Sequence, residues 1–501
     1  MIGRKSLLIV LTKGVSAILG FAGLFLITRY FSESAYGQIA YTMALVGLFY
    51  SFADLGFSTA HIKRVNEGKD PGDCLSTYLT IKLTLTVTFV VIVIASFWLW
   101  TDVLGHPLTD TSFELLTVFV LYYTFFNISQ MATATFDAFQ QTAKTQTALI
   151  VEMAVRVPLI IILAIPTEST FALATCYMVG GLAVMLVSFL FLFRDHIKLK
   201  RPTLLKSYSK FALPLAFAVV IGVIVVNIDK VALGFFWGSV EVANYAAGQS
   251  IMTMLFVFGA ALSTLLFPTF SRLYENGNSN SMSEIVRKGE RYLSFILTPI
   301  VCVLLVQPVL IATVLLSGKY IGSAEVIQVL SLNVLTLGLG GVYSTHIVAS
   351  NRAKDVAWLS ALQLFLLMLF IVLFVPTAFF GIPMLGMKAT GTALALLCTT
   401  LIIVFLSRLI IWKMTGLGYN RRMTMHLPAG LLSIAVLYAL GITYSPERWY
   451  DILLLWAVSC AVFYGFLYIV KELERGDIAY FAEVVNPKEM LIYLRSEFKG
   501  K

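Results

Sequence analysis

The sequence predicts an all-α polytopic membrane protein with fourteen transmembrane helices, arranged as two pseudo-symmetric six-helix lobes plus two C-terminal helices. The first supporting observation is composition: 59% of the 501 residues are apolar or aromatic, and only 13% are charged. Soluble domains are nearer 45–50% apolar and about 25% charged. So few charges cannot cover a surface in water. This excludes a soluble enzyme, a nucleic-acid binder, a secreted disulfide scaffold and a disordered protein.

The second observation is a series of long apolar runs. A helix needs about 20 apolar residues to cross the hydrocarbon core of a bilayer. The loops between the runs leave no room for a sizeable extramembrane domain. In chain order the fourteen runs cover residues 7–31, 36–62, 75–101, 113–137, 146–165, 170–193, 210–236, 242–271, 291–316, 324–349, 356–375, 389–412, 427–444 and 451–470.

The third observation is the distribution of Lys and Arg, which are enriched in cytoplasmic loops of membrane proteins. With the N-terminus inside, the cytoplasmic segments hold 27 of the 36 basic residues, the outer loops four and the spans five. An odd number of spans would break this alternation midway. We therefore expect both termini to be cytoplasmic, and we interpret the net charge of +9 as this asymmetry plus attraction to anionic lipid.

The richest basic loop divides the chain. It runs from Arg194 to Lys210, between spans 6 and 7. The sequence around span 1, its outer loop and span 2 resembles that around spans 7 and 8, with Tyr36-Gly37 matching Tyr245 and Gly248. Repeats of this kind surround a central path in many transporters. The predicted units are an N-terminal lobe (1–200), a C-terminal lobe (201–415), spans 13–14 (416–470) and an amphipathic or solvated cytoplasmic tail (471–501).

The residues that usually carry chemistry are scattered. The five cysteines and five histidines lie far apart, whereas metal sites need clustered ligands. No nucleotide-binding loop is present, so ATP does not drive this chain directly. We expect no metal, no cofactor and no enzymatic activity.

Charged residues inside the spans are the informative ones. A charge at the bilayer centre costs about 2.5–3.5 kcal/mol even on the insertion scale, so it faces a partner or a watery cavity. Five basic residues stand against three deeply placed acids in the spans. This balance favours an anionic substrate such as a phosphate or pyrophosphate, whereas a cavity for organic cations needs excess acids. These eight residues are Lys13, Asp54, Lys82, Glu152, Arg156, Asp229, Lys230 and Arg408.

Each of these residues also has a structural interpretation. Lys82 and Arg408 lie near enough to an interface for their long side chains to reach it. Glu152 and Arg156 are four residues apart on one helix face, so they are expected to pair, either as a structural ion pair or at a cavity.

The remaining charges leave similar alternatives. The adjacent Asp229 and Lys230 are expected to point in different directions, so one of them faces a neighbouring helix. Lys13 and Asp54 are deeper, which favours a cavity. Arg29 ends span 1, where it serves as an interfacial anchor or faces the cavity.

The sequence resembles the Wzx-type polysaccharide and O-antigen flippases of the multidrug/oligosaccharidyl-lipid/polysaccharide exporter superfamily. The resemblance covers nearly the whole chain, and the order and spacing of its motifs are more specific than any one of them. The motifs are the turn 29–37, the end of span 2 at 53–60, Asn227–Lys230 with Tyr245, Ser317–Tyr320 with Leu330, Ala349–Lys354, and the outer loop from Gly381 to Gly391 with Ala393.

The resemblance implies a central cationic cavity between two lobes, alternating access, and a polyprenyl-(pyro)phosphate-linked oligosaccharide as substrate. It also implies that spans 1, 2, 7 and 8 line the cavity, and that spans 13 and 14 form a groove for the lipid tail. The implied cavity residues are Lys13, Arg29, Asp54, Asp229 and Lys230; Arg156 is a candidate from its depth alone.

The leading hypothesis is therefore a plasma-membrane flippase for lipid-linked glycans. Its expected partners are this substrate and membrane lipids, with glycan polymerase or glycosyltransferase machinery as further candidates and no nucleic acid. The alternative is a cation-coupled multidrug antiporter of the same fold. A membrane-bound glycan polymerase or ligase ranks last, because such enzymes carry a large outer loop and the outer loops here are short.

Overall fold

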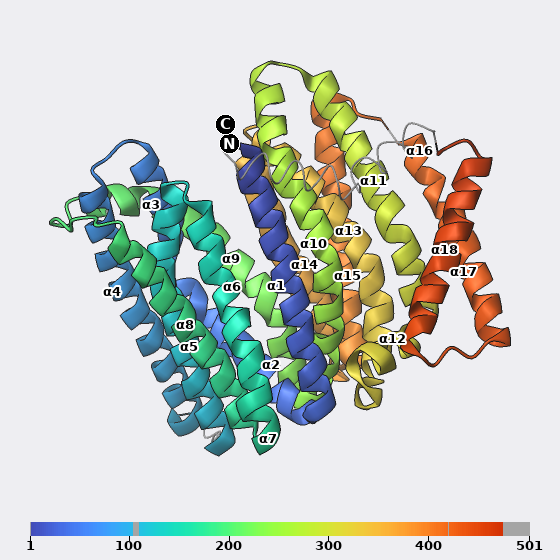
Figure 1. Cartoon of the computed structure of the whole chain (residues 1–501), viewed down its shortest axis with the longest axis horizontal. Coiled ribbons are helices and arrows are strands. Elements are labelled where there is room, and N and C mark those ends of the chain that lie inside the picture. Colours follow the sequence, from blue (N-terminus) through green and yellow to red (C-terminus); the bar gives the residue numbers. More distant parts are fainter. Residues whose placement is uncertain (1, 104–109, 419, 474–501) are drawn as a thin grey trace.

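The structure is a computed structural model that describes residues 2–103, 110–418 and 420–473. Within these ranges the chain is almost entirely helical (Figure 1). In the first half the helices are α1 (Ile2–Tyr30), α2 (Glu33–Phe49), α3 (Phe57–Asn66), α4 (Pro71–Trp98), α5 (Asp110–Ala138), α6 (Thr142–Leu159), α7 (Ile165–Thr167) and α8 (Thr170–Arg194).

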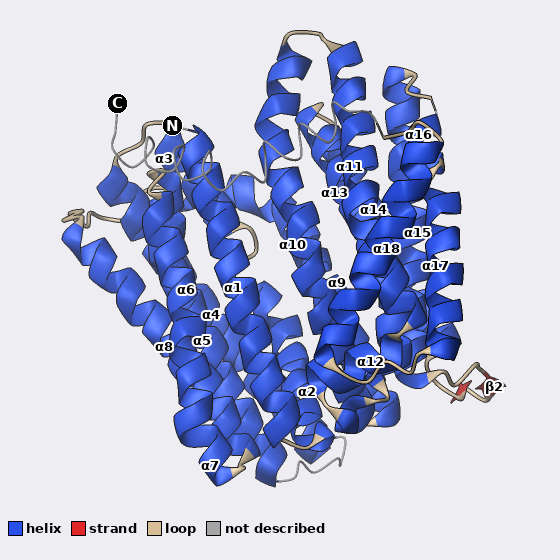
Figure 2. Cartoon of the chain, turned by 45° about the vertical axis from the view of Figure 1, so that its right-hand side comes forward, coloured by secondary structure: helices blue, strands red, loops and turns tan. Residues whose placement is uncertain are grey.

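The described residues of the second half form ten more α-helices and one small hairpin near the end of α14, seen at the edge of the molecule in Figure 2. The helices are α9 (Leu205–Trp237), α10 (Ser239–Glu275), α11 (Ser279–Val306), α12 (Pro308–Ile311), α13 (Ser323–Ala349), α14 (Ala353–Phe374), α15 (Lys388–Thr415), α16 (Arg421–Thr424), α17 (His426–Thr443) and α18 (Trp449–Ile469). Strands β1 (Ala378–Phe379) and β2 (Ile382–Pro383) pair antiparallel.

Local sequence explains where several helices begin. Ser32 precedes α2 and accepts a hydrogen bond from the backbone N–H of Ala35, and Ser169 does the same for α8. Asp70 caps α4, with Pro71 at the first helical position. Such residues satisfy N–H groups that have no partner within the helix, and proline is preset for this position.

The helices of each half pack mainly among themselves. In the first half, α5 and α6 both pack on α8, and α3 and α4 pack on α5; in the second half, α13 packs on α10, α11 and α15. Helices α17 and α18 pack on each other and on α11, at the far edge of the molecule in Figure 1. The two groups meet where α1 and α2 contact α10 and where α2 and α3 contact α9. The lobe boundaries at residues 200, 415 and 470 stay predictions.

The membrane-spanning character of the chain is clear from its helices. Among the described residues, twelve helices are long and apolar enough to cross a membrane, and the bent pair α2–α3 makes a thirteenth. The eighth predicted span falls within α10, which has 37 residues but is not among these. The large apolar residues of α4 at positions 83, 87, 91, 94 and 98 are about half exposed or more and recur at helical spacing, as expected of a face in contact with lipid. The count of fourteen crossings stays a prediction.

The sidedness of the bundle is compatible with the predicted topology. In Figure 1 the start of α1 and the α3–α4, α8–α9 and α10–α11 connections lie at the same end of the molecule. These connections include the richest basic loop. We call this end the inner end and the opposite one the outer end. The cytoplasmic location of both termini stays a prediction, and the predicted tail after residue 473 lies outside the described residues.

Two predicted spans are interrupted. The run 36–62 is divided into α2 and α3, whose axes differ by 42°. The run 291–316 ends as a regular helix at Val306, and a second short helix starts at Pro308, which cannot continue the hydrogen-bond ladder of α11. Apolar content predicts the length of a span but does not reveal such a break.

Candidate functional site

Among the described residues, two adjoining cavities with charged side chains in their walls lie where the two halves of the chain meet. The larger has a volume of about 520 Å³ and is lined by α1, α6, α8 and α10, with one residue from α2. The smaller, of about 230 Å³, lies between α2, α5, α8, α9 and α10. Tyr36, Tyr177 and Ser250 line both, so these three residues lie between the two spaces.

The charges that line these cavities are all positive. Lys13 of α1 and Arg156 of α6 line the larger cavity, and Lys230 of α9 lines the smaller. Among the described residues that line either space there is no Asp or Glu. Lys13 is half-buried and forms no ion pair with any described residue. No described carboxylate therefore competes for its ammonium.

The guanidinium of Arg156 is held by its neighbours. It pairs with Glu152, one helical turn earlier, at 2.8 Å, which confirms the predicted pairing. Its other face lies 4.2 Å from the centre of the Tyr177 ring. Gly180 of α8 allows this packing, since a Cβ there would lie 3.1 Å from the carbonyl oxygen of Glu152. Arg156 is thus buried and oriented, yet part of the cavity wall.

Asp229 lies behind the smaller cavity and does not line it. Its carboxylate accepts hydrogen bonds from the Tyr245 hydroxyl at 2.8 Å and the Gln249 amide at 3.1 Å. The Lys230 ammonium folds back to within 3.3 Å of the same carboxylate. The expectation that the two charges point apart is therefore wrong. Asp229 holds a polar cluster in place, and Lys230 and Gln249 are the members that line the cavity.

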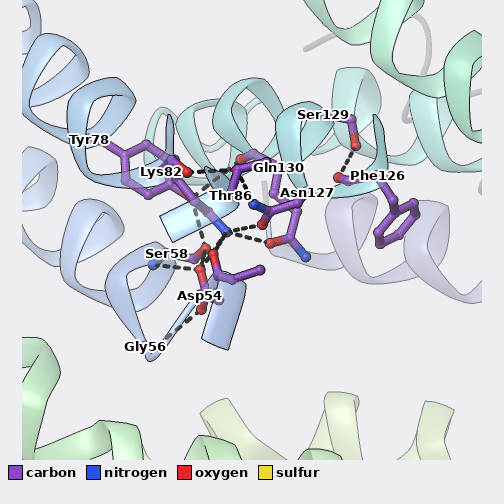
Figure 3. Close-up of polar contacts among 11 residues, drawn as sticks. Asp54, Gly56, Ser58, Tyr78, Lys82, Thr86, Phe126, Asn127, Ser129 and Gln130 are labelled. Atoms are coloured by element: carbon purple, nitrogen blue, oxygen red, sulfur yellow. Dashed lines mark hydrogen bonds and ion pairs between the residues drawn. The ribbon is translucent and has the colours of Figure 1, made fainter. Parts of the chain in front are cut away.

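Asp54 is placed outside both cavities, in a polar cluster within the first half of the chain (Figure 3). It pairs with Lys82 at 2.7 Å. Lys82 is fully buried, so the expectation that it reaches an interface is wrong. The reason is that oxygen atoms from α5, including those of Asn127 and Gln130, provide a better partner set than a distant water layer.

Arg29 is also placed outside both cavities. Its guanidinium donates to the backbone carbonyls of Leu316 at 3.1 Å and Val314 at 2.9 Å, and it stacks on the ring of Phe25. These carbonyls end a short π-helical turn before α13. The sequence left two alternatives for Arg29, an anchor or a cavity residue. The structure favours an anchor, but one that binds protein carbonyls and not the membrane interface.

Arg408 differs from its predicted role as well. It donates to the buried carboxylate of Glu290 at 2.8 Å and to the carbonyls of Leu417 and Gly418. The arginine thus satisfies a carboxylate and the chain after α15 within the protein.

The outer end of the bundle is closed by contacts between the two halves. The hydroxyls of Ser34 and Ser239 lie 3.2 Å apart, and Thr28 donates to the carbonyl of Leu316 at 2.7 Å. At Gly37 the backbones of α2 and α10 are so close that an added Cβ would lie 1.8 Å from the Ser239 carbonyl oxygen. The two repeated motifs of the sequence therefore touch each other here. Towards the inner end the helices of the two halves diverge in Figures 1 and 2.

The sequence did not single out the tyrosines of this site. Tyr36 and Tyr177 separate the cavities, and Tyr123 lines the smaller one. The chain has 22 tyrosines, and nothing in their spacing separates these three from the others. Tyr36 alone carried a signal, as part of the repeated Tyr-Gly motif.

Comparisons with known proteins agree with this architecture. The family model described as polysaccharide biosynthesis protein matches residues 2–274. An uncharacterized membrane protein of Methanocaldococcus jannaschii is 29% identical over 116 residues, and the match spans 23% of each protein.

Two similar solved structures are transporters. The lipid II flippase MurJ in an inward closed conformation has a TM-score of 0.72 at 15% identity, covering 92% of this chain and 98% of MurJ. An inward-facing multidrug resistance MATE family transporter of the MOP superfamily has a TM-score of 0.62 at 13% identity, covering 81% and 96%. At these identities the likeness shows the fold.

Proposed function

The chain belongs to the polysaccharide biosynthesis protein family, and from that premise we propose that it is a flippase for lipid-linked glycans. It moves an oligosaccharide joined by phosphate or pyrophosphate to a polyprenyl carrier, from the cytoplasmic to the outer leaflet of the plasma membrane. The physical task is to carry a hydrated head through hydrocarbon, where unsatisfied polar groups cost several kcal/mol each.

The observation that carries the proposal is the charge of the cavities between the two halves. Lys13, Arg156 and Lys230 line them without a carboxylate among the described lining residues. Arginine binds phosphate through two parallel N–H groups, and lysine acts as a point charge. The larger volume of about 520 Å³ also lies within the range of about 300–1,000 Å³ that is typical of small-molecule sites.

Each part of the substrate has a matching environment. The (pyro)phosphate binds to Arg156 and Lys13, and Lys230 receives it as it moves into the smaller cavity. Sugar hydroxyls bond to neutral polar side chains such as Gln146 and Thr253 of the larger cavity. The polyprenyl tail stays in lipid, against the groove that the resemblance assigns to α17 and α18.

Transport then follows from alternating access. The outer end is closed by Ser34, Gly37 and Ser239, and the helices diverge towards the inner end, which supports loading from the cytoplasm as the first step. Separation of α2 from α10 at these residues opens the outer side. A bound anion favours whichever state places more cations around it, since a ligand shifts an equilibrium only by its differential affinity.

A cation-coupled multidrug antiporter is the alternative that the MATE-like fold allows. The same charges disfavour it, because three cations in the cavity wall repel an organic cation. Glycan polymerase or glycosyltransferase machinery that makes or consumes the substrate is the partner this proposal expects.

The experiment is disruption of the coding sequence, complemented with native protein, Arg156→Ala, Arg156→Lys or Lys13→Ala. Loss of surface glycan with accumulation of lipid-linked oligosaccharide in the inner leaflet is expected for the disruption and both alanine variants. Arg156→Lys is expected to recover part of the export, because lysine keeps the positive charge but lacks the two parallel N–H groups of the guanidinium. Ile94→Ala, on the exposed apolar face of α4, is the matched control and should export normally. Unchanged glycan with altered drug sensitivity would instead support the antiporter.

A further inference from the structure

The buried cluster around Lys82 has the make-up of a cation site. Four oxygen atoms surround the ammonium: a carboxylate oxygen of Asp54 at 2.7 Å, the side-chain oxygens of Asn127 at 2.7 Å and Gln130 at 2.9 Å, and the carbonyl of Ala53 at 3.3 Å (Figure 3). Lys82 and Asn127 are both fully buried. Oxygen atoms of carboxylate, amide and carbonyl groups are the ligands that hard cations prefer.

Neighbouring groups orient these oxygens. The amide nitrogen of Asn127 donates to the hydroxyl of Thr86 at 2.6 Å, so the amide oxygen faces the ammonium. The backbone N–H and hydroxyl of Ser58 both donate to Asp54, and that hydroxyl also bonds Tyr78. The arrangement is therefore built from several elements and is not a pair of surface side chains that happen to meet.

The cluster lies at the break between α2 and α3. Leu55 and Gly56 both have left-handed backbone angles, with φ of 48° and 82°. This conformation is strained for leucine. The ammonium binds the carbonyl of Ala53, at the end of the 3₁₀ turn that follows α2, while the Asp54 carboxylate accepts N–H groups at the start of α3. The Asp54–Lys82 ion pair therefore provides hydrogen-bond partners for backbone groups on both sides of the break.

We propose that these four oxygens form a binding site for a monovalent cation of the ammonium type, and that the tethered ammonium of Lys82 fills it and sets the bend of this span. The site is separate from the two cavities, and the proposal does not depend on the identity of the transported substrate. Lys82 acts here as a positioning residue.

The location of the bend gives the site a role in motion. The outer half, α2, touches α10 at Gly37 and Ser34. The inner half, α3, is bonded to the start of α9, through His61 to the Tyr208 hydroxyl at 3.0 Å and Arg64 to the Ser207 carbonyl at 2.8 Å. The cation thus fixes the angle between an outer contact and an inner contact of the two halves.

The test replaces Lys82 with alanine and adds a free ammonium compound to occupy the site. In Lys82→Ala the missing atoms correspond to n-propylammonium, and n-propanol is the uncharged molecule of the same shape. Thermal unfolding of the purified protein is measured with each compound at matched ionic strength, beside the native protein. We expect the melting temperature to fall by several degrees in Lys82→Ala, and n-propylammonium to restore at least half of the loss. Neither compound should change the native protein.

A second measurement tests whether Lys82 sets the angle between α2 and α3. Spin labels on the outer ends of α2 and α10 report their separation, and Lys82→Ala should broaden that distance distribution unless n-propylammonium is present. Equal rescue by n-propanol would overturn the proposal, since it would mean that only a void was filled; no loss of stability would overturn it as well.

The double variant Asp54→Asn with Lys82→Met covers the case in which Lys82→Ala does not fold. It removes both charges, so it should be more stable than Lys82→Met alone, because a buried carboxylate is no longer left without its cation. Equal stability of the two variants would overturn the proposal.

Discussion

A tight backbone contact between the two halves gives the sharpest test of the proposed transport cycle. Gly37, near the start of α2, packs on the first residue of α10. A Cβ at this position would lie 1.8 Å from the carbonyl oxygen of Ser239 and 2.6 Å from its carbonyl carbon, where ordinary contact begins at 3.4 Å. The neighbouring atoms belong to backbone, so no rotamer change can relieve the overlap. Gly37→Ala must therefore push the outer ends of α2 and α10 apart.

The magnitude follows from overpacking. Inserting a methyl group into a tightly packed contact costs about 1–3 kcal/mol. In a state where the outer ends have separated, the methyl group meets nothing and the cost disappears. A difference of about 1–3 kcal/mol shifts an equilibrium about 5- to 150-fold, here towards the outward-open state. The change in helix propensity from glycine to alanine is the same in both states, so it does not shift the equilibrium between them.

The assay is labelling from outside with a membrane-impermeant maleimide, at a cysteine placed at Ser34 in a protein without its five native cysteines. We expect faster labelling in Gly37→Ala and slower glycan export, because the inward-loading state is rarer. Gly465→Ala is the matched control: this glycine also lies inside a helix, and an added Cβ there meets nothing within 4 Å. Equal labelling rates for the two variants would refute the argument that this contact holds the outer side closed.

Three further predictions concern the second half of the chain. Arg408→Ala leaves the buried Glu290 without its cation, so a loss of about 3 kcal/mol is expected in thermal or denaturant unfolding; an unchanged midpoint would contradict the role given to this pair. Burial tends to raise the pKa of Glu472, but the ring of His426 and the guanidinium of Arg291 outweigh it and hold the pKa below 4.5. The stabilisation that the Glu472 carboxylate provides is therefore fully present at neutral pH and is lost only as the pH falls through that lowered pKa. The melting temperatures of the native protein and of Glu472→Gln should differ at neutral pH and converge in acid. A difference that stays constant with pH would argue against the ion pair. Deleting α17, α18 and the tail should abolish handling of the lipid-linked substrate, whereas full export would refute the proposed tail groove.

Much of the fold could be predicted from the sequence. The composition and apolar runs identify a helical membrane protein, because the bilayer imposes span length and apolar surface on every crossing. The spacing of Glu152 and Arg156 predicted their pairing, because residues four apart lie on one helix face. The Tyr36-Gly37 repeat also marked the region where the two halves touch.

The partners of the other buried charges could not be predicted in this way. Lys82 and Arg408 were expected to extend towards an interface. Instead Lys82 is bound by Asp54 and by residues of α5 that are 45 and 48 positions away, and Arg408 is bound by Glu290, 118 positions away. Such partners depend on how helices cross, which apolar periodicity does not encode. Likewise, the break at Leu55 and Gly56 interrupts a stretch that qualifies as one span by length and composition.

That the chain spans a membrane, and that its spans contain more cations than acids, follows from which residues are present and could be predicted without a structure. Which of those cations face an open space depends on how the helices pack. Lys13, Arg156 and Lys230 line the cavities, while Arg29 binds backbone carbonyls and Asp54 is bound to Lys82. The physical reason is that a charge in a low-dielectric interior takes the best set of partners within reach, and only folding sets which partners those are.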